Sequence, residues 1–251
     1  MATSYGVIPA EIAKANIVIV SVRDTQLDPA LAEVVEATKR GTIPRGTVVL
    51  HTSAIAEPAA VSVLTNSGFP SGTFHPLVPF TDPEISAQLM KKGWIGIDGD
   101  TAAKNASRRL AGHIGARTLD IPPGKKPAYH AAAVISSNFP VVLASVASHL
   151  LNSIGVPEAS AYGAVESLMM GAFANMKQAV PDDALTGPVV RGDPEAIDKH
   201  LRALRSRGST LAVYKALSLA AVEIAERKGT DAKKLAAVRG LLRAATTDES
   251  A

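Results

Sequence analysis

The segment 184–193 combines residue types that bind anions. It reads ALTGPVVRGD, so a hydroxyl (Thr186), a Gly-Pro turn and a guanidinium (Arg191) lie within ten residues. Asp193 and Pro194 are typical of the N-cap and the first residue of a helix, whose free N–H groups favour negative charge. A guanidinium beside a helix N-terminus suits a carboxylate or a phosphate. The segment therefore indicates an anion-binding loop, with a plain turn and helix cap as the alternative.

A second group of polar residues opens a long apolar segment. Lys126, His130, Ser137 and Asn138 recur at helical spacing, which places them along one side of a helix with Asn138 slightly rotated. An imidazole can protonate a carbonyl oxygen as hydride arrives, and an amide can orient that oxygen. The alternative is that these residues cap the helix and make polar contacts with other helices.

His75 is followed by a proline, which restricts the backbone of His75 to an extended conformation. Histidine titrates near neutral pH, so this side chain can pass a proton or donate to an oxygen. A single histidine is more often structural, and its position alone favours that interpretation.

Short apolar runs alternate with helical patterns in the first half of the chain, which is typical of a parallel sheet with crossover helices. The predicted strands cover residues 17–22, 47–50, 94–97 and 117–119. The predicted helices cover residues 28–40, 57–65 and 101–113, and residues 68–83 read as a loop. These elements predict half of a doubly wound sheet.

The first two predicted strands each end in residues with ligand-binding side chains. These residues are Ser21, Val22, Arg23 and Asp24 after the first strand, and Thr52 and Ser53 after the second. Ligands of such sheets bind beyond the carboxyl ends of the strands. Hydroxyls there can bond a ribose, an amide or a substrate, and a guanidinium can bind a phosphate. Ordinary strand-to-helix connectors are the alternative.

The second half of the chain has helical spacing throughout. The predicted helices cover residues 128–151, 157–178, 194–207, 210–228 and 231–245, the last capped by Thr230. A Pro-Pro-Gly sequence at 122–124 marks the boundary between the two parts. The prediction is an α/β domain over residues 1–123 and an all-α domain over residues 124–251.

The amino-acid composition argues against several classes of function. The chain has 251 residues, 47% of them hydrophobic, and no cysteine, so a substantial core is expected and disulfides and thiolate nucleophiles are excluded. The net charge of +3, with 4% aromatic residues, argues against nucleic acid as a partner. Neither a secretory leader nor an apolar run of membrane-spanning length is apparent, so a cytoplasmic protein is expected. The histidines lack the spacing of a metal site.

Five motifs occur in order: SVRD, HTS, HPL, YHAAA followed by SN, and ALTGPVVRGD. In this combination, over about residues 12–228, the chain resembles the Rossmann-like proteins with a helical C-terminal domain of unknown function. These are relatives of ketopantoate reductase, pyrroline-carboxylate reductase and 6-phosphogluconate dehydrogenase. The resemblance implies an oxidoreductase that uses NADP, or NAD, to transfer hydride to a small anionic keto acid or imine. It also implies a helical domain that forms a homodimer.

The resemblance also implies roles for individual residues around a cleft between the domains. The catalytic candidates are His130 and Asn138, with Lys126 as a competitor of His130, and His75. The substrate-binding candidates are Thr186, Arg191, Ser53 and Ser137. The cofactor-binding candidates are Ser21, Val22, Arg23, Asp24 and Thr52.

The chain departs from the family pattern at its beginning. The family starts with a strand, a Gly-x-Gly-x-x-Gly loop and a helix, and no such βαβ unit of about 30 residues precedes residue 15 here. Three explanations compete: a chain that starts late, loss of the cofactor, or another chain that completes the sheet. Loss of the cofactor predicts an alternative function, a non-enzymatic binding or assembly module. Without the central strand, residues 17–22 would form an exposed apolar edge.

Overall fold

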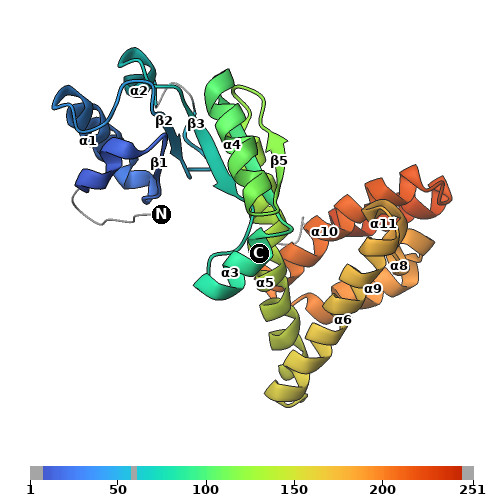
Figure 1. Cartoon of the computed structure of the whole chain (residues 1–251). Helices are drawn as coiled ribbons and strands as arrows, with labels where there is room; N and C mark the ends of the chain where they lie inside the picture. The colour runs from blue at the N-terminus through green and yellow to red at the C-terminus, as the bar shows by residue number, and fades with distance from the viewer. Residues whose placement is uncertain (1–7, 58–60, 245–251) are drawn as a thin grey trace. The chain divides into compact units, whose positions relative to one another are not determined.

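The computed structural model describes residues 8–57 and 61–244 (Figure 1). The chain divides into two compact units, Met1–Pro140 and Val141–Ala251. The division falls inside helix α5 (Lys126–Asn152), later than the predicted boundary at 122–124, because the first turn of α5 is anchored in the first unit. Each unit is described separately below.

The first unit is built on a five-stranded sheet in the order β1-β2-β3-β4-β5. The strands are β1 (Ile17–Val20), β2 (Val48–His51), β3 (Ser71–Pro76), β4 (Trp94–Gly99) and β5 (Arg117–Asp120). All neighbouring pairs are parallel except β3 and β4, which are antiparallel. The predicted Rossmann-like α/β class is confirmed, but the expectation of an all-parallel sheet is wrong at this one pair.

Alternating residues of the strands build two cores, one on each face of the sheet. Val49 of β2 belongs to a core with side chains of α1 (Leu27–Lys39) and α2 (Ser62–Asn66). The next residue, Leu50, belongs to the other core, with side chains of β4 and α4 (Thr101–His113). Because successive side chains of a strand point to opposite faces, a sheet covered on both faces needs such continuous apolar runs.

β1 forms one edge of the sheet. Three of its four residues are only partly buried, and Ile17 and Ile19 contact the α4-side core from its margin. β1 is thus an edge strand, but it covers only residues 17–20, and its side chains are partly buried or buried rather than exposed as the predicted edge over 17–22 would have them. Two 3₁₀ segments, Ala10–Lys14 and Asp24–Gln26, flank this strand along the chain.

Two predicted elements need correction. The segment 68–83 contains strand β3 rather than a loop, and helix α3 (Pro83–Met90) follows it. Gly72 and Pro76 made this strand hard to predict, because glycine and proline are uncommon inside strands. The predicted helix over 57–65 is found only as the short α2, and residues 58–60 lie outside the described part of the chain.

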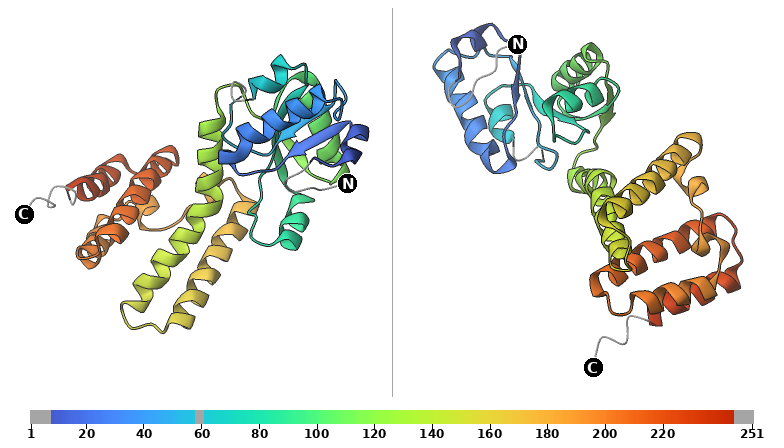
Figure 2. Two further views of the ribbon diagram at one scale, coloured as in Figure 1. Left: turned by 90° about the vertical axis from the view of Figure 1, so that its left-hand side faces the viewer. Right: turned by 90° about the horizontal axis from the view of Figure 1, so that it is seen from below.

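The second unit consists of helices. They are the end of α5, α6 (Glu158–Gln178), α7 (Pro181–Ala184), α8 (Pro188–Arg191), α9 (Pro194–Leu204), α10 (Gly208–Arg227) and α11 (Ala232–Ala244). Figure 2 shows α6 running back along the end of α5 after a short turn. Side chains from α8 to α11 form the core, with Ile197, Val222 and Val238 fully buried. The predicted helical domain is confirmed in its long helices.

The caps of two helices were predicted from sequence, with different outcomes. Asp193 caps α9 as predicted, and its carboxylate accepts from Ala196 N at 3.1 Å. The prediction that Thr230 caps the last helix is wrong. Asp231 accepts from Lys234 N at 2.9 Å instead, while Thr230 Oγ1 donates to the carbonyl of Val190 at 2.8 Å. Thr230 therefore ties the turn before α11 to α8.

By length and composition, two helices in the described part of the chain could cross a membrane, namely α5 and α10. We expected no membrane span because the sequence has no uninterrupted apolar run of that length. These two helices meet the criterion because their mean hydropathy is high. Two such helices are weak evidence for a membrane span, because the core helix of a globular protein passes the same test. α10 is such a helix, since it supplies the buried Val222 and Ala225 to the core of the second unit.

Candidate functional site

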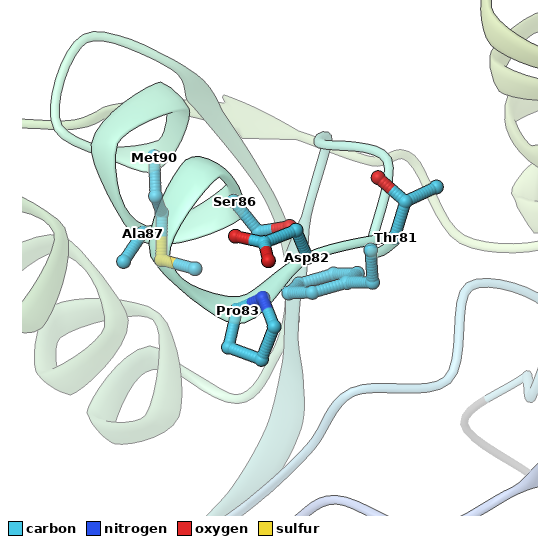
Figure 3. A pocket seen from close by; sticks show the side chains of 7 residues that line it. Thr81, Asp82, Pro83, Ser86, Ala87 and Met90 are labelled. Atoms are coloured by element: carbon cyan, nitrogen blue, oxygen red, sulfur yellow. The ribbon is translucent and has the colours of Figure 1, made fainter.

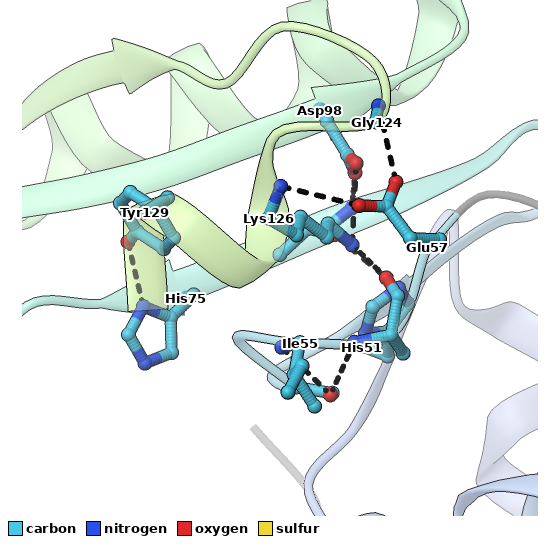
Figure 4. A network of polar contacts seen from close by, with 11 residues as sticks. His51, Ile55, Glu57, His75, Asp98, Gly124, Lys126 and Tyr129 are labelled. Carbon is cyan, nitrogen blue, oxygen red and sulfur yellow. Dashed lines mark hydrogen bonds and ion pairs between the residues drawn. The ribbon is translucent and has the colours of Figure 1, made fainter. Parts of the chain in front are cut away.

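A buried ion pair lies beneath the start of α5 (Figure 4). Lys126 is 1% exposed, and its Nζ lies 3.2 Å from Oδ2 of Asp98 on β4. The same Nζ donates to Thr73 Oγ1 on β3 at 2.5 Å and to the carbonyl of Ala56. Three acceptors thus match the three protons of the ammonium group. The arrangement makes Lys126 an anchor between α5 and the sheet.

Glu57 fixes the backbone at the same place. Its two carboxylate oxygens accept from Gly124 N and Lys126 N, both at 3.2 Å. The first N–H groups of a helix have no partner within the helix, so a carboxylate there stabilises the helix start. The head of α5 is therefore held by both a side chain and the backbone.

Burial shifts the protonation equilibria of this cluster. Desolvation lowers the pKa of Lys126, although the adjacent Asp98 carboxylate opposes that shift. Desolvation also lowers the pKa of His51 to about 4, with Lys126 adding to the effect. His51 is therefore neutral at physiological pH. Its Nε2 lies 3.3 Å from Thr73 Oγ1, and its buried Nδ1 has no hydrogen-bond partner among the described residues.

At the end of the first turn of α5, aromatic and imidazole groups meet. Tyr129 Oη lies 2.7 Å from Nδ1 of His75, and the two rings are edge to face with centroids 5.6 Å apart. Burial lowers the pKa of His75 to about 4, and the nearby His130 and Lys126 contribute to this shift. His130 follows Tyr129 directly, and its buried Nδ1 has no partner in the described structure. Two imidazoles thus lie near each other at the head of α5.

The remaining candidates on α5 are Ser137 and Asn138. Both are exposed and lie about two turns beyond His130. No contact joins them to the imidazoles in the described structure, so their predicted roles stay predictions.

The carboxyl end of β1 presents an exposed group of candidates. Ser21, Val22, Arg23 and Asp24 are all exposed. The helix that follows is not a phosphate cradle, because α1 begins after a 3₁₀ segment and carries Asp28 in its first turn. A negative side chain opposes an anion at a helix N-terminus.

At the end of β2, Thr52 is half-buried and Ser53 is buried. Ser53 Oγ accepts from Ile55 N at 3.3 Å and from Ala56 N at 3.0 Å. Its oxygen therefore stabilises the turn after β2, and only its hydroxyl proton is available for a substrate.

The predicted anion-binding loop lies in the second unit and is described by itself. Arg191 ends α8 and is exposed, and Thr186 is exposed on the preceding turn. Gly187 and Gly192 both have positive φ, of 110° and 62° respectively. The loop is thus shaped by glycines, with its guanidinium on the surface, as an anion site requires.

A shallow pocket lies at the N-terminus of α3 (Figure 3). It is lined by Phe80, Thr81, Asp82, Pro83, Ser86, Ala87 and Met90. Asp82 already accepts from Glu84 N and Ile85 N, both at 2.9 Å. The pocket contains none of the residues that the sequence singles out. Elsewhere in the described structure no group of three or more His, Asp or Glu side chains could hold a metal ion.

Sequence reasoning missed four residues of this cluster: Glu57, Thr73, Asp98 and Tyr129. Asp98 carries the clearest signal, because it is a carboxylate inside the apolar strand WIGIDG. A buried carboxylate needs a cationic partner. Tyr129 carries a weaker signal, since it merely precedes His130 in a helix.

Solved structures resemble this chain over most of its length. A Thermotoga maritima protein has 26% identity and a TM-score of 0.67, with 84% of this chain and 78% of that chain covered. A candidate NADP oxidoreductase from Bacteroides fragilis has 23% identity and a TM-score of 0.63, with 83% and 76% covered. Pyrroline carboxylate reductase of Plasmodium falciparum, solved with NADP bound, has 11% identity and a TM-score of 0.57, with 90% and 79% covered. No curated protein matches the sequence significantly.

A family model matches residues 94–221, from β4 into α10. This span contains the buried Asp98 and Lys126, the two residues Tyr129 and His130, and the loop of Arg191. The match covers half of the sequence, and its description is a domain of unknown function. The chain therefore belongs to the DUF2520 family.

Proposed function

We propose that this protein is an NADP-dependent oxidoreductase that acts on a small anionic keto acid or imine. The observation that carries the proposal is the head of α5, where His130 and His75 lie beside the carboxyl end of β3. A likeness in fold to a candidate NADP oxidoreductase and to an NADP-bound pyrroline carboxylate reductase supports it.

In this proposal His130 is the proton donor. Bound NADPH would supply hydride to the electrophilic carbon, and the attached oxygen or nitrogen would then need a proton from the protein. Nδ1 of His130 is buried and has no hydrogen-bond partner among the described residues, and an unsatisfied buried polar atom of this kind is a feature that a catalytic role would explain. Lys126 is the weaker candidate, because Asp98, Thr73 and the Ala56 carbonyl already engage its ammonium group. Arg191 would hold the anionic group of the substrate, and Asn138 would orient the reacting oxygen.

The residues at the sheet edge fit a dinucleotide only in part. Ser21, Arg23 and Thr52 offer polar groups to a ribose or an amide. The described residues do not supply a glycine-rich cradle for the pyrophosphate, and α1 carries an acidic residue, Asp28, in its first turn. This misfit favours a second candidate function, a binding or assembly module that does not hold a dinucleotide.

Titration of the full chain with NADPH, followed by cofactor fluorescence, separates the two functions. Saturable binding in the micromolar range supports the oxidoreductase. Absence of binding up to millimolar NADPH contradicts it and supports the module.

Kinetics with a panel of keto acids and cyclic imines then test the residue roles. We expect His130→Ala to lower kcat at least about a hundredfold, the usual contribution of a positioned general acid. Arg191→Ala should raise KM about tenfold or more, because a charge-assisted hydrogen bond is worth about 1.5–3 kcal/mol. The matched control is His149→Ala, an exposed histidine of the same helix. Unchanged turnover in His130→Ala would exclude His130 as the donor.

A further inference from the structure

The contact between Tyr129 and His75 joins two elements of the first unit (Figure 4). His75 lies in β3, next to its last residue, and Tyr129 lies in the first turn of α5. The phenol oxygen is 2.7 Å from Nδ1 of the imidazole. The other ring nitrogen, Nε2, points away from Tyr129 in Figure 4.

The position of the ring proton follows from the acid–base properties of the pair. Burial lowers the pKa of His75 to about 4, so the imidazole is neutral and carries one proton. Burial raises the pKa of Tyr129 above its ordinary value, so the phenol keeps its proton. Within the described structure Nδ1 of His75 is the hydrogen-bond partner of the phenol. If Nδ1 carried the ring proton, it would donate to the phenol oxygen and leave the phenol proton without an acceptor among the described residues, which favours the tautomer in which Nδ1 accepts and Nε2 bears the proton.

Gly96 makes room for this contact. It pairs with His75 across the antiparallel strands β3 and β4, directly below the ring of Tyr129. A Cβ at this position would lie 2.7 Å from Cζ of Tyr129 and 3.1 Å from Cδ1 of Ile121. Contacts this short are repulsive, so any larger residue would displace the phenol from the imidazole.

We propose that Tyr129, seated over Gly96, is a positioning residue that holds His75 in its Nε2–H tautomer. His75 is thereby a neutral hydrogen-bond donor aimed away from the protein cluster, suited to an oxygen of a bound keto acid. A neutral imidazole can polarise a carbonyl without giving up its proton. The ligand assignment rests on the proposed oxidoreductase function, whereas the tautomer does not. The two imidazoles then have different roles. His75 stabilises negative charge on the oxygen, and His130 donates the proton.

The tautomer can be measured on the full chain without substrate, by long-range ¹H–¹⁵N NMR of ¹⁵N-histidine-labelled protein at pH 7. His75→Gln identifies the signals of His75 by their loss. We expect Nδ1 to show the shift of an unprotonated nitrogen and Nε2 that of a protonated one. A protonated Nδ1 in the unmodified chain overturns the proposal.

Tyr129→Phe removes the phenol oxygen and keeps the ring. We expect the His75 signals to move to values averaged over both tautomers, while urea unfolding confirms that the variant is folded. Gly96→Ala should produce the same change by displacing the phenol. The control is Tyr214→Phe, which removes a phenol that lies 2.8 Å from Nδ1 of His200 in the second unit and should leave the His75 signals unchanged. An unaltered tautomer in Tyr129→Phe overturns the positioning role.

Kinetics address the ligand assignment separately. With a substrate that turns over, Tyr129→Phe should lower kcat about tenfold and leave KM nearly unchanged, as expected for a group that acts mainly in the transition state. If NADPH neither binds nor reacts, the proposed function fails, and the NMR result still decides the role of Tyr129. If turnover occurs and Tyr129→Phe is fully active, the contribution of this tautomer to catalysis is refuted.

Discussion

The ammonium group of Lys126 is held by three acceptors in the first unit. It is buried, and its attraction to Asp98 offsets the cost of removing two charges from water only because further acceptors complete its hydrogen bonds. Removal of one partner would leave the other charge buried and alone. Such a pair tolerates substitution of single residues poorly.

We predict that Lys126→Met lowers the free energy of unfolding by about 3–5 kcal/mol, the usual cost of an uncompensated buried charge. Methionine fills a similar volume, so the effect reports the lost charge pairing. The control is Lys125→Met, an exposed neighbour that should change stability by less than about 0.5 kcal/mol. Equilibrium urea unfolding at pH 7 measures both variants. Equal stability of the two variants would show that the ion pair contributes nothing.

Sequence alone identified Lys126 and His75 as chemically important but did not reveal their partners. The helical period placed Lys126 and His130 on one side of a helix, which says nothing of what that side contacts. Asp98 and Thr73 reach Lys126 from strands β4 and β3, so the contact depends on sheet order. Such long-range pairings are not encoded in local spacing.

The loop between α8 and α9 depends on both its backbone conformation and its packing against another helix. Gly192 ends α8 in the left-handed region, with φ of 62°. A Cβ on this residue would lie 2.8 Å from Cβ of Lys234 on α11. The glycine therefore meets two requirements, a positive φ and close approach to another helix.

We predict that Gly192→Ala destabilises the protein by about 2–4 kcal/mol, as the sum of about 1 kcal/mol for the left-handed backbone and about 1–3 kcal/mol for overpacking. Gly229→Ala separates the two effects, because Gly229 has φ of 79° and nothing within 4 Å of its added Cβ. We expect Gly229→Ala to lower the free energy of unfolding only by the cost of the left-handed backbone, about 1 kcal/mol. Thermal and urea unfolding of both variants give the comparison, and identical losses would eliminate the steric contribution.

Long elements with strong periodicity were predicted well, and short ones were not. The helix over 101–113 is found with those bounds as α4, because an Asp cap and a regular apolar face both mark it. β3 was missed because its core positions include glycine, threonine and histidine. Tertiary contacts, with α4 on one side and Lys126 on the other, stabilise that strand where local propensity does not.

At the scale of the whole molecule, unpartnered apolar side chains suggest association. Tyr162, Phe173 and Met176 of α6 are 60%, 39% and 42% exposed. At 100° per residue these positions fall on one side of the helix. An exposed apolar stripe of this kind is typical of a protein interface. The family resemblance leads to the same expectation, a homodimer formed through the helical domain.

We predict that the full chain is a homodimer at micromolar concentration and that Phe173→Glu together with Met176→Glu shifts it to monomer. Two buried charges without partners should raise the dissociation constant at least about a hundredfold, since loss of an interface anchor costs about 2 kcal/mol or more. Leu168→Glu is the matched control, because Leu168 is 74% exposed on a different side of α6. Size-exclusion chromatography with light scattering distinguishes the species. A monomeric unmodified chain, or a dimer that survives the double substitution, would show that this stripe does not hold two copies together.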